Sequence, residues 1–161
     1  MANYNNYNNR RPNNGYNQNR QQNNFSSNKQ NEEKRIDFTS TTYVDKAEEV
    51  IKVLADANRG KPKLSTSKIR NILSLVSDIY NDVMLEANSV LDEKYVSRIQ
   101  YIKMRIAYEA GREPDVKNFV NEAGLIYNIN KIGNDKQKLI LFCHYVEALV
   151  AYHRFYGGAD N

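Results

Sequence analysis

The stretch "KQKLILFCHYVEALVAYHRFY", residues 136–156, decides the fold class. Drawn as a helix, it is apolar on most of its circumference, whereas a surface helix has a single apolar stripe. Such a helix needs neighbours on most of its sides, so we expect it at the centre of a helical bundle. Asp135 precedes it, and Gly157 and Gly158 end it.

Four more helices are predicted before this one, and no segment has a convincing strand pattern. Apolar residues recur at helical spacing in residues 43–58, 65–87, 92–111 and 114–133. The predicted fold is therefore all-α, with a compact five-helix bundle over residues 43–158 and a C-terminal end at 159–161. Short loops favour an up-down arrangement of sequential helices.

Local signals mark the ends of these helices. A capping-box-like Thr42-x-x-Asp45 precedes the first, Asp92 is placed to cap the third, and Pro114 suits the first turn of the fourth. Gly124 makes the middle of the fourth helix its weakest part, because glycine is a poor helix former.

The first 31 residues, "MANYNNYNNRRPNNGYNQNRQQNNFSSNKQN", are dominated by Asn and Gln and contain almost no aliphatic residue. We expect this segment to be disordered and residues 32–42 to be a linker, so that residues 1–42 form a low-complexity tail and linker. Two roles stay open for the tail: a solubilising segment, or a weak RNA contact through arginine and stacked tyrosine.

The charge is balanced outside the tail. The chain has 161 residues and a net charge of +4, but the first 31 residues hold four basic residues and no acid, which leaves 19 of each sign. Attraction for a polyanion must then come from where the charges sit. The single Cys143 excludes an internal disulfide, and we read no signal peptide or membrane span, so the expected location is the cytoplasm.

Cations crowd the start of the second helix in "KPKLSTSKIRN", residues 61–71. Basic side chains at a helix start oppose the helix dipole, so their presence calls for another reason. In an up-down bundle this start lies beside the ends of the third and fifth helices and the start of the fourth. We call the cations expected there the basic pole: Arg59, Lys61, Lys63, Lys68, Arg70, Arg112 and Arg154.

A second pattern follows the third helix. Basic and aromatic residues alternate there at 4-3-4-3-4 spacing, which places them on one stripe: Lys94, Arg98, Tyr101, Arg105, Tyr108 and Arg112. Asp82 and Glu86 of the second helix are expected to pair with Arg98 and Lys94 across the hairpin.

Nothing acidic on the second helix continues down to Arg105 and Arg112, so an external phosphate would relieve the repulsion at that end. A solvated basic face is the other interpretation. Glu109, Glu113 and Asp115 lie nearby in the sequence and favour it.

No catalytic, metal or cofactor site is predicted. Cys143 and His144 are adjacent on a helix, so their side chains point about 100° apart and do not form a nucleophile and base pair. No second helix supplies the partners that His144 and Glu147 would need to hold a metal. We interpret Cys143 as a core residue and His144 as a partly buried histidine.

Three blocks in this order, "LSTSKIRNILSLVSDIYN", "YIKMRIAYEAGRE" and "LILFCHYVEALVAYHRFYGG", resemble the small subunit of type III-A CRISPR effector complexes, the Csm complex. The resemblance covers about Tyr43 to Gly158. It implies a non-catalytic helical protein, present in more than one copy along a filament of backbone subunits that hold the guide RNA, and in contact with guide RNA, target RNA and the large subunit.

The resemblance also implies RNA contacts at basic residues within the three blocks. Combined with the basic pole and the stripe, it gives the predicted RNA-binding set: Lys61, Lys63, Lys68, Arg70, Arg98, Lys103, Arg105, Arg112 and Arg154. Lys103 points to a different face of its helix from Arg105, and so fits a single patch less well. The alternative function is a protein adaptor whose cations meet acidic partner surfaces.

Overall fold

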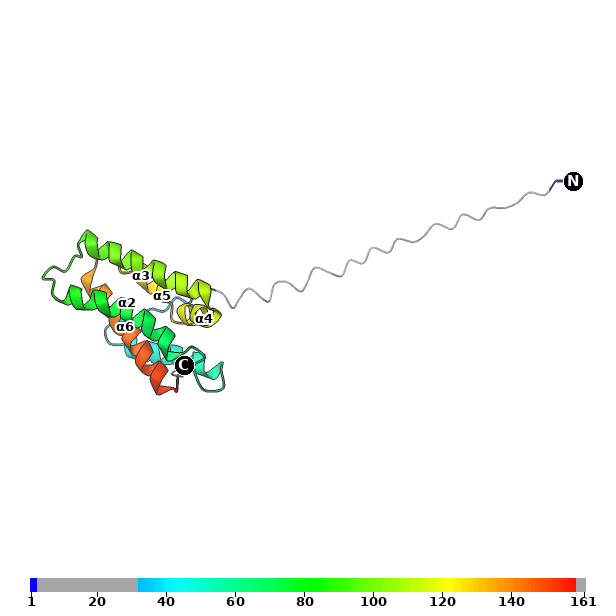
Figure 1. Cartoon of the computed structure of the whole chain (residues 1–161), viewed down its shortest axis with the longest axis horizontal. Coiled ribbons are helices and arrows are strands. Elements are labelled where there is room, and N and C mark those ends of the chain that lie inside the picture. The colour runs from blue at the N-terminus through cyan, green and yellow to red at the C-terminus, as the bar shows by residue number, and fades with distance from the viewer. Residues whose placement is uncertain (3–31, 159–161) are drawn as a thin grey trace. The chain divides into compact units, whose positions relative to one another are not determined.

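The computed structural model describes residues 1–2 and 32–158, and within these it is helical without a strand (Figure 1). Its helices are α1 (Tyr43–Asp56), α2 (Thr66–Met84), α3 (Glu93–Arg112), α4 (Pro114–Glu122), α5 (Leu125–Asn130) and α6 (Lys136–Phe155). The all-α fold class is thus confirmed. Residues 3–31 of the predicted tail and the C-terminal end at 159–161 lie outside the described residues.

The central position expected for residues 136–156 is confirmed. Helix α6 packs against both α1 and α2, and buries side chains on several sides. These buried residues are Leu139, Phe142, Cys143, Tyr145, Val146, Leu149 and His153. The helix begins at a side-chain cap, because the Asp135 carboxylate accepts the N–H groups of Gln137 and Lys138 at 2.9 and 3.1 Å.

Helices α2 and α3 form an antiparallel hairpin, whose loop lies at one end of the bundle (Figure 1). The two predicted ion pairs are present: Lys94 Nζ lies 3.0 Å from Glu86 Oε1, and Arg98 pairs with Asp82. The two pairs show that the register between α2 and α3 is the one expected from the sequence.

The predicted fourth helix is two helices, so the five-helix count needs a correction. Gly124 has a left-handed backbone (φ 57°), which ends α4 and turns the chain into α5. A β-carbon at this position would lie 2.5 Å from the carbonyl oxygen of Lys34. Glycine is therefore required at position 124 both by the left-handed turn and by the close approach of an earlier segment.

That earlier segment is residues 33–38, here called the N-terminal strap. The Lys34 N–H donates to the Asn121 carbonyl at 2.9 Å, and the Lys34 side chain pairs with Glu122. The Glu33 carboxylate accepts the Tyr127 N–H at 2.7 Å. These contacts tie the strap to α4 and α5.

The strap also covers the core next to α6. Phe38 stacks on Tyr145 with 4.2 Å between ring centroids, and Ile36 packs against the core. Asp37 pairs with Lys131 and accepts the Tyr127 hydroxyl, and both contacts lower the pKa of Asp37. Residues 33–38 are thus part of the packed unit, and the interpretation of all of residues 32–42 as a linker is wrong for them.

The start of α1 also differs from the prediction. Thr42 occupies the N-cap position but its side chain caps no helical N–H group. Its hydroxyl instead accepts the Thr39 N–H at 2.9 Å, so the local turn over residues 39–42 replaces the predicted capping box.

Candidate nucleic-acid interface

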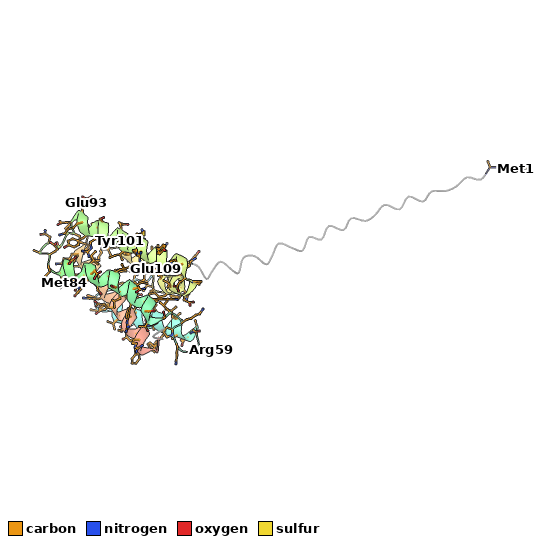
Figure 2. All side chains as sticks on the ribbon, in the orientation of Figure 1. Met1, Arg59, Met84, Glu93, Tyr101 and Glu109 are labelled. Carbon is orange, nitrogen blue, oxygen red and sulfur yellow. The ribbon has the colours of Figure 1, made fainter. Side chains whose placement is uncertain are left out.

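The predicted pole exists, because contacts bring its four parts together. Lys63 and Lys68, which flank the start of α2, pair with Asp115 (2.9 Å) and Glu113 at the junction of α3 and α4. The hydroxyl of Thr66 donates to the Gly158 carbonyl at 3.3 Å, which joins the start of α2 to the segment after α6. Arg59 lies at this end, and Met84 and Glu93 lie at the other (Figure 2).

Acidic side chains of α3 and α4 neutralise part of this pole. Besides the two lysine pairs, Arg105 and Arg112 share one carboxylate, that of Glu109, at 3.3 and 3.5 Å. No carboxylate of α2 pairs with these arginines among the described residues, as predicted, but an acid of their own helix does. The local repulsion therefore needs no external anion to be tolerated.

Three cations of the basic pole keep their charge unpaired. Arg59, Lys61 and Arg70 are exposed and form no ion pair within the part of the chain that the structure describes. Arg154 is different, because its guanidinium lies 3.5 Å from the Gly158 carbonyl. Among the cations of the basic pole, Arg59, Lys61 and Arg70 are therefore available to a polyanion without breaking an ion pair.

The predicted RNA-binding set does not lie on one face. Lys68 faces the junction of α3 and α4, and Arg70, two residues later, points to the opposite side of α2. On α3 the same spacing separates half-buried Lys103 from Arg105, as expected. Arg98 lies further toward the hairpin loop, beside Asp82.

The outer face of α3 combines exposed aromatic and apolar side chains with arginines. Tyr101, Met104 and Tyr108 are 54%, 51% and 53% exposed. The guanidinium carbons of Arg105 and Arg112 lie 5.7 and 5.5 Å from the centroid of the Tyr108 ring, within the range of cation–π attraction. Sequence reasoning found the tyrosines and missed Met104, although the spacing 101, 104, 108 marks one helical face.

His153 is a second residue that the sequence analysis left without a role. It is buried, its Nε2–H donates to the Leu64 carbonyl at 2.7 Å, and Gly158 lies against its ring. Burial lowers the pKa of His153, although the Leu64 carbonyl opposes this effect. His153 therefore stabilises this pole when its imidazole ring is neutral.

Cys143 and His144 have the surroundings predicted for them. Cys143 is fully buried, and burial raises the pKa of its thiol to about 12. His144 is half-buried, with Nε2 3.3 Å from the Tyr80 hydroxyl. In the described ranges no group of three metal-ligating side chains comes together, and no helix is long and apolar enough to cross a membrane.

Fold and surface define a class: a small helical bundle with a cationic pole built around the start of its second long helix. Comparison with known proteins gives the family. The family model for Csm2 of type III-A systems matches residues 37–159. The chain belongs to this family, which confirms the resemblance to the Csm small subunit.

Individual relatives agree with the family match. The chain is 38% identical to the CRISPR system Cms protein Csm2 of Streptococcus thermophilus over 122 residues, which cover 76% of this chain and 97% of the relative. A Mycobacterium tuberculosis (strain CDC 1551 / Oshkosh) protein of the same name is 36% identical over 113 residues, covering 66% and 91%. One from Enterococcus italicus is 35% identical over 111 residues, covering 64% and 79%.

Proposed function

We propose that this chain is the non-catalytic small subunit of a type III-A CRISPR interference complex, and that it binds the phosphate backbone of guide and target RNA. Copies of the chain stack along the backbone filament, next to the backbone and large subunits, in the cytoplasm. Guide pairing supplies the sequence specificity, and the small subunit adds affinity without reading bases.

One observation carries the RNA-binding part. Arg59 and Lys61 lie in the loop before α2 and Arg70 lies in the first two turns of α2, and all three are exposed and without ion pairs among the described residues. Phosphate oxygens are suitable partners for such groups, especially the planar guanidinium of arginine. Lys63, Lys68, Arg105 and Arg112 extend this surface once their carboxylate partners are displaced.

The decisive experiment measures target-RNA affinity of the reconstituted complex across salt concentrations. Arg70→Ala and Lys61→Ala should each weaken binding by a similar factor for unrelated RNA sequences. Each should also reduce the slope of log affinity against log salt by about 0.7 to 0.9 in magnitude. Arg35→Ala is the matched control, because Arg35 is exposed, also lacks an ion pair among the described residues, and lies on the N-terminal strap.

The adaptor function predicts another outcome. If the cations meet acidic partner proteins, the pole variants should fail to enter the complex, while complexes that do form keep the wild-type salt slope. The non-catalytic assignment is tested with labelled RNA and divalent metal. Cleavage by the purified chain that disappears in His144→Ala would contradict it.

A further inference from the structure

The outer face of α3 carries aromatic rings whose exposure the proposed phosphate contacts do not explain. Tyr101 and Tyr108 are each more than half exposed, and α3 is one of the two longest helices of the structure. Figure 2 labels Tyr101 on this helix between Glu93 and Glu109. An exposed ring is a flat apolar surface, and RNA bases are the part of RNA that stacks on such surfaces.

The charges beside Tyr108 favour RNA over an acidic protein as the partner of this face. Arg105 and Arg112 share the single carboxylate of Glu109, so this group carries one excess positive charge. Both guanidinium groups lie near the same ring. A nucleotide offers both matching parts at once, a base for the ring and a phosphate for the guanidinium groups.

The guanidinium group of Arg105 is also incompletely hydrogen-bonded. Its Nε is buried and has no hydrogen-bond acceptor among the described residues, while its Nη2 lies 3.3 Å from Glu109. A charged donor without an acceptor is costly, so an outward rotation toward a phosphate oxygen would relieve it. The resting contact with Glu109 is long enough to be exchanged for a shorter one.

We propose that the outer face of α3 is a binding site for unpaired RNA nucleotides, with bases stacked on Tyr101 and Tyr108 and phosphates held by Arg105 and Arg112. The inference rests on the proposed RNA-binding function and adds the kind of RNA recognised. Bases inside a continuous duplex have no free face, so the site selects single-stranded or extruded nucleotides. The two rings are seven residues apart, about 10.5 Å along the helix, which corresponds to about three nucleotide steps in a stacked strand.

The test compares two probes on the full chain: a short fluorescein-labelled single-stranded RNA and the same RNA annealed to its complement. In the double variant Tyr101→Leu/Tyr108→Leu, the affinity for the single strand should fall about five-fold or more for each tyrosine replaced. Its affinity for the duplex, and the slope of log affinity against log salt, should stay as in the wild type. Tyr101→Phe/Tyr108→Phe should bind like the wild type, because it keeps the rings. Phe155→Leu is the matched control for an exposed aromatic (77%) on another helix.

Each other result overturns the inference and says which part fails. Unchanged single-strand affinity in the leucine variant, with a flatter salt slope in Arg105→Ala, refutes stacking and leaves backbone binding in place. Absence of salt-dependent RNA binding by the wild-type chain and by its complex refutes the proposed function as well. Loss of incorporation into the complex with unchanged RNA binding makes this face a protein interface.

Discussion

His153 Nε2 lies 2.7 Å from the carbonyl oxygen of Leu64, a contact that ties the last turn of α6 to the segment before α2. The nitrogen that faces the carbonyl must carry the proton, which leaves Nδ1 as a buried acceptor without a partner among the described residues. A second proton would place a buried positive charge beside Arg154. The pole at which RNA binding is proposed is thus built around a neutral histidine.

This arrangement predicts that the folded state becomes less stable as the pH is lowered. The pKa of His153 is lowered from 6.5 in the folded state, so the unfolded chain binds more protons below that pH. The stabilisation is complete above about pH 6.5 and is lost as the pH falls toward the lowered pKa. Urea unfolding between roughly pH 5 and 7 measures it.

His153→Gln is the control for this pH dependence. A glutamine amide can donate to the Leu64 carbonyl and does not titrate. In the variant, the free energy of unfolding should therefore lose the part of its pH dependence that comes from His153. The carboxylates with lowered pKa values, Asp37, Glu48 and Glu86, lose their charge at lower pH and act outside this window. If the free energy of unfolding of the variant depends on pH as in the wild type, the effect comes from another group.

Gly158→Ala should destabilise the chain by about 1 to 3 kcal/mol, because a β-carbon there would overlap the His153 ring. The ring cannot move freely, since its Nε2 is bonded to Leu64. Thermal unfolding measures the loss. Gly111→Ala is the matched control, because nothing lies within 4 Å of its added β-carbon, and it should stabilise α3 by up to about 1 kcal/mol. Equal melting temperatures for both variants would be inconsistent with the proposed packing at the pole.

The N-terminal strap predicts a sharp boundary between dispensable and required residues. Removal of residues 1–31 should leave the melting temperature unchanged, since the strap begins at residue 33. Phe38→Ala should cost about 2 kcal/mol, because it removes a half-buried ring stacked on Tyr145. Phe155→Ala, on an exposed ring, should stay within about 0.5 kcal/mol of wild type. A large loss on removal of residues 1–31 would show that packing extends further toward the N-terminus.

The carboxylates at the pole predict a gain-of-affinity variant. Glu113→Gln/Asp115→Asn releases Lys68 and Lys63 from their ion pairs and should raise RNA affinity at low salt by about three-fold per carboxylate. Asp45→Asn, in the first turn of α1, changes the net charge without freeing a pole cation and should have a smaller effect. Equal gains from both changes would mean that only net charge matters.

Much of the fold follows from short-range patterns. The apolar circumference of residues 136–156 predicted the central α6, and the spacing of Asp82 and Glu86 predicted the ion pairs of the hairpin. The break at Gly124 was visible only as a weak point, because glycine is compatible with both a helix and a left-handed turn. In the structure Gly124 takes the left-handed turn and lies against the backbone of Lys34, a segment about ninety residues earlier.

Other features were beyond a reading of the sequence. The strap has no periodicity, and its partners lie about ninety residues later, as Glu33 and Tyr127 show. The pairing of Lys63 and Lys68 with Asp115 and Glu113 depends on the side-chain directions at the junction of α3 and α4. The sequence could place these acids near the pole, but could not say which cations they neutralise.

The strap has a consequence for the order in which the chain folds. Its residues leave the ribosome before any of the helices, yet Asn121, Glu122 and Tyr127, which hold it, are made roughly ninety residues later. Closing a loop of this length is slow compared with forming a helical hairpin, so we expect the strap to dock after α2 and α3 have paired. We expect the amide protons of the strap to exchange before those of α6, because the strap is held by fewer contacts and should detach in a local opening that leaves the helices folded.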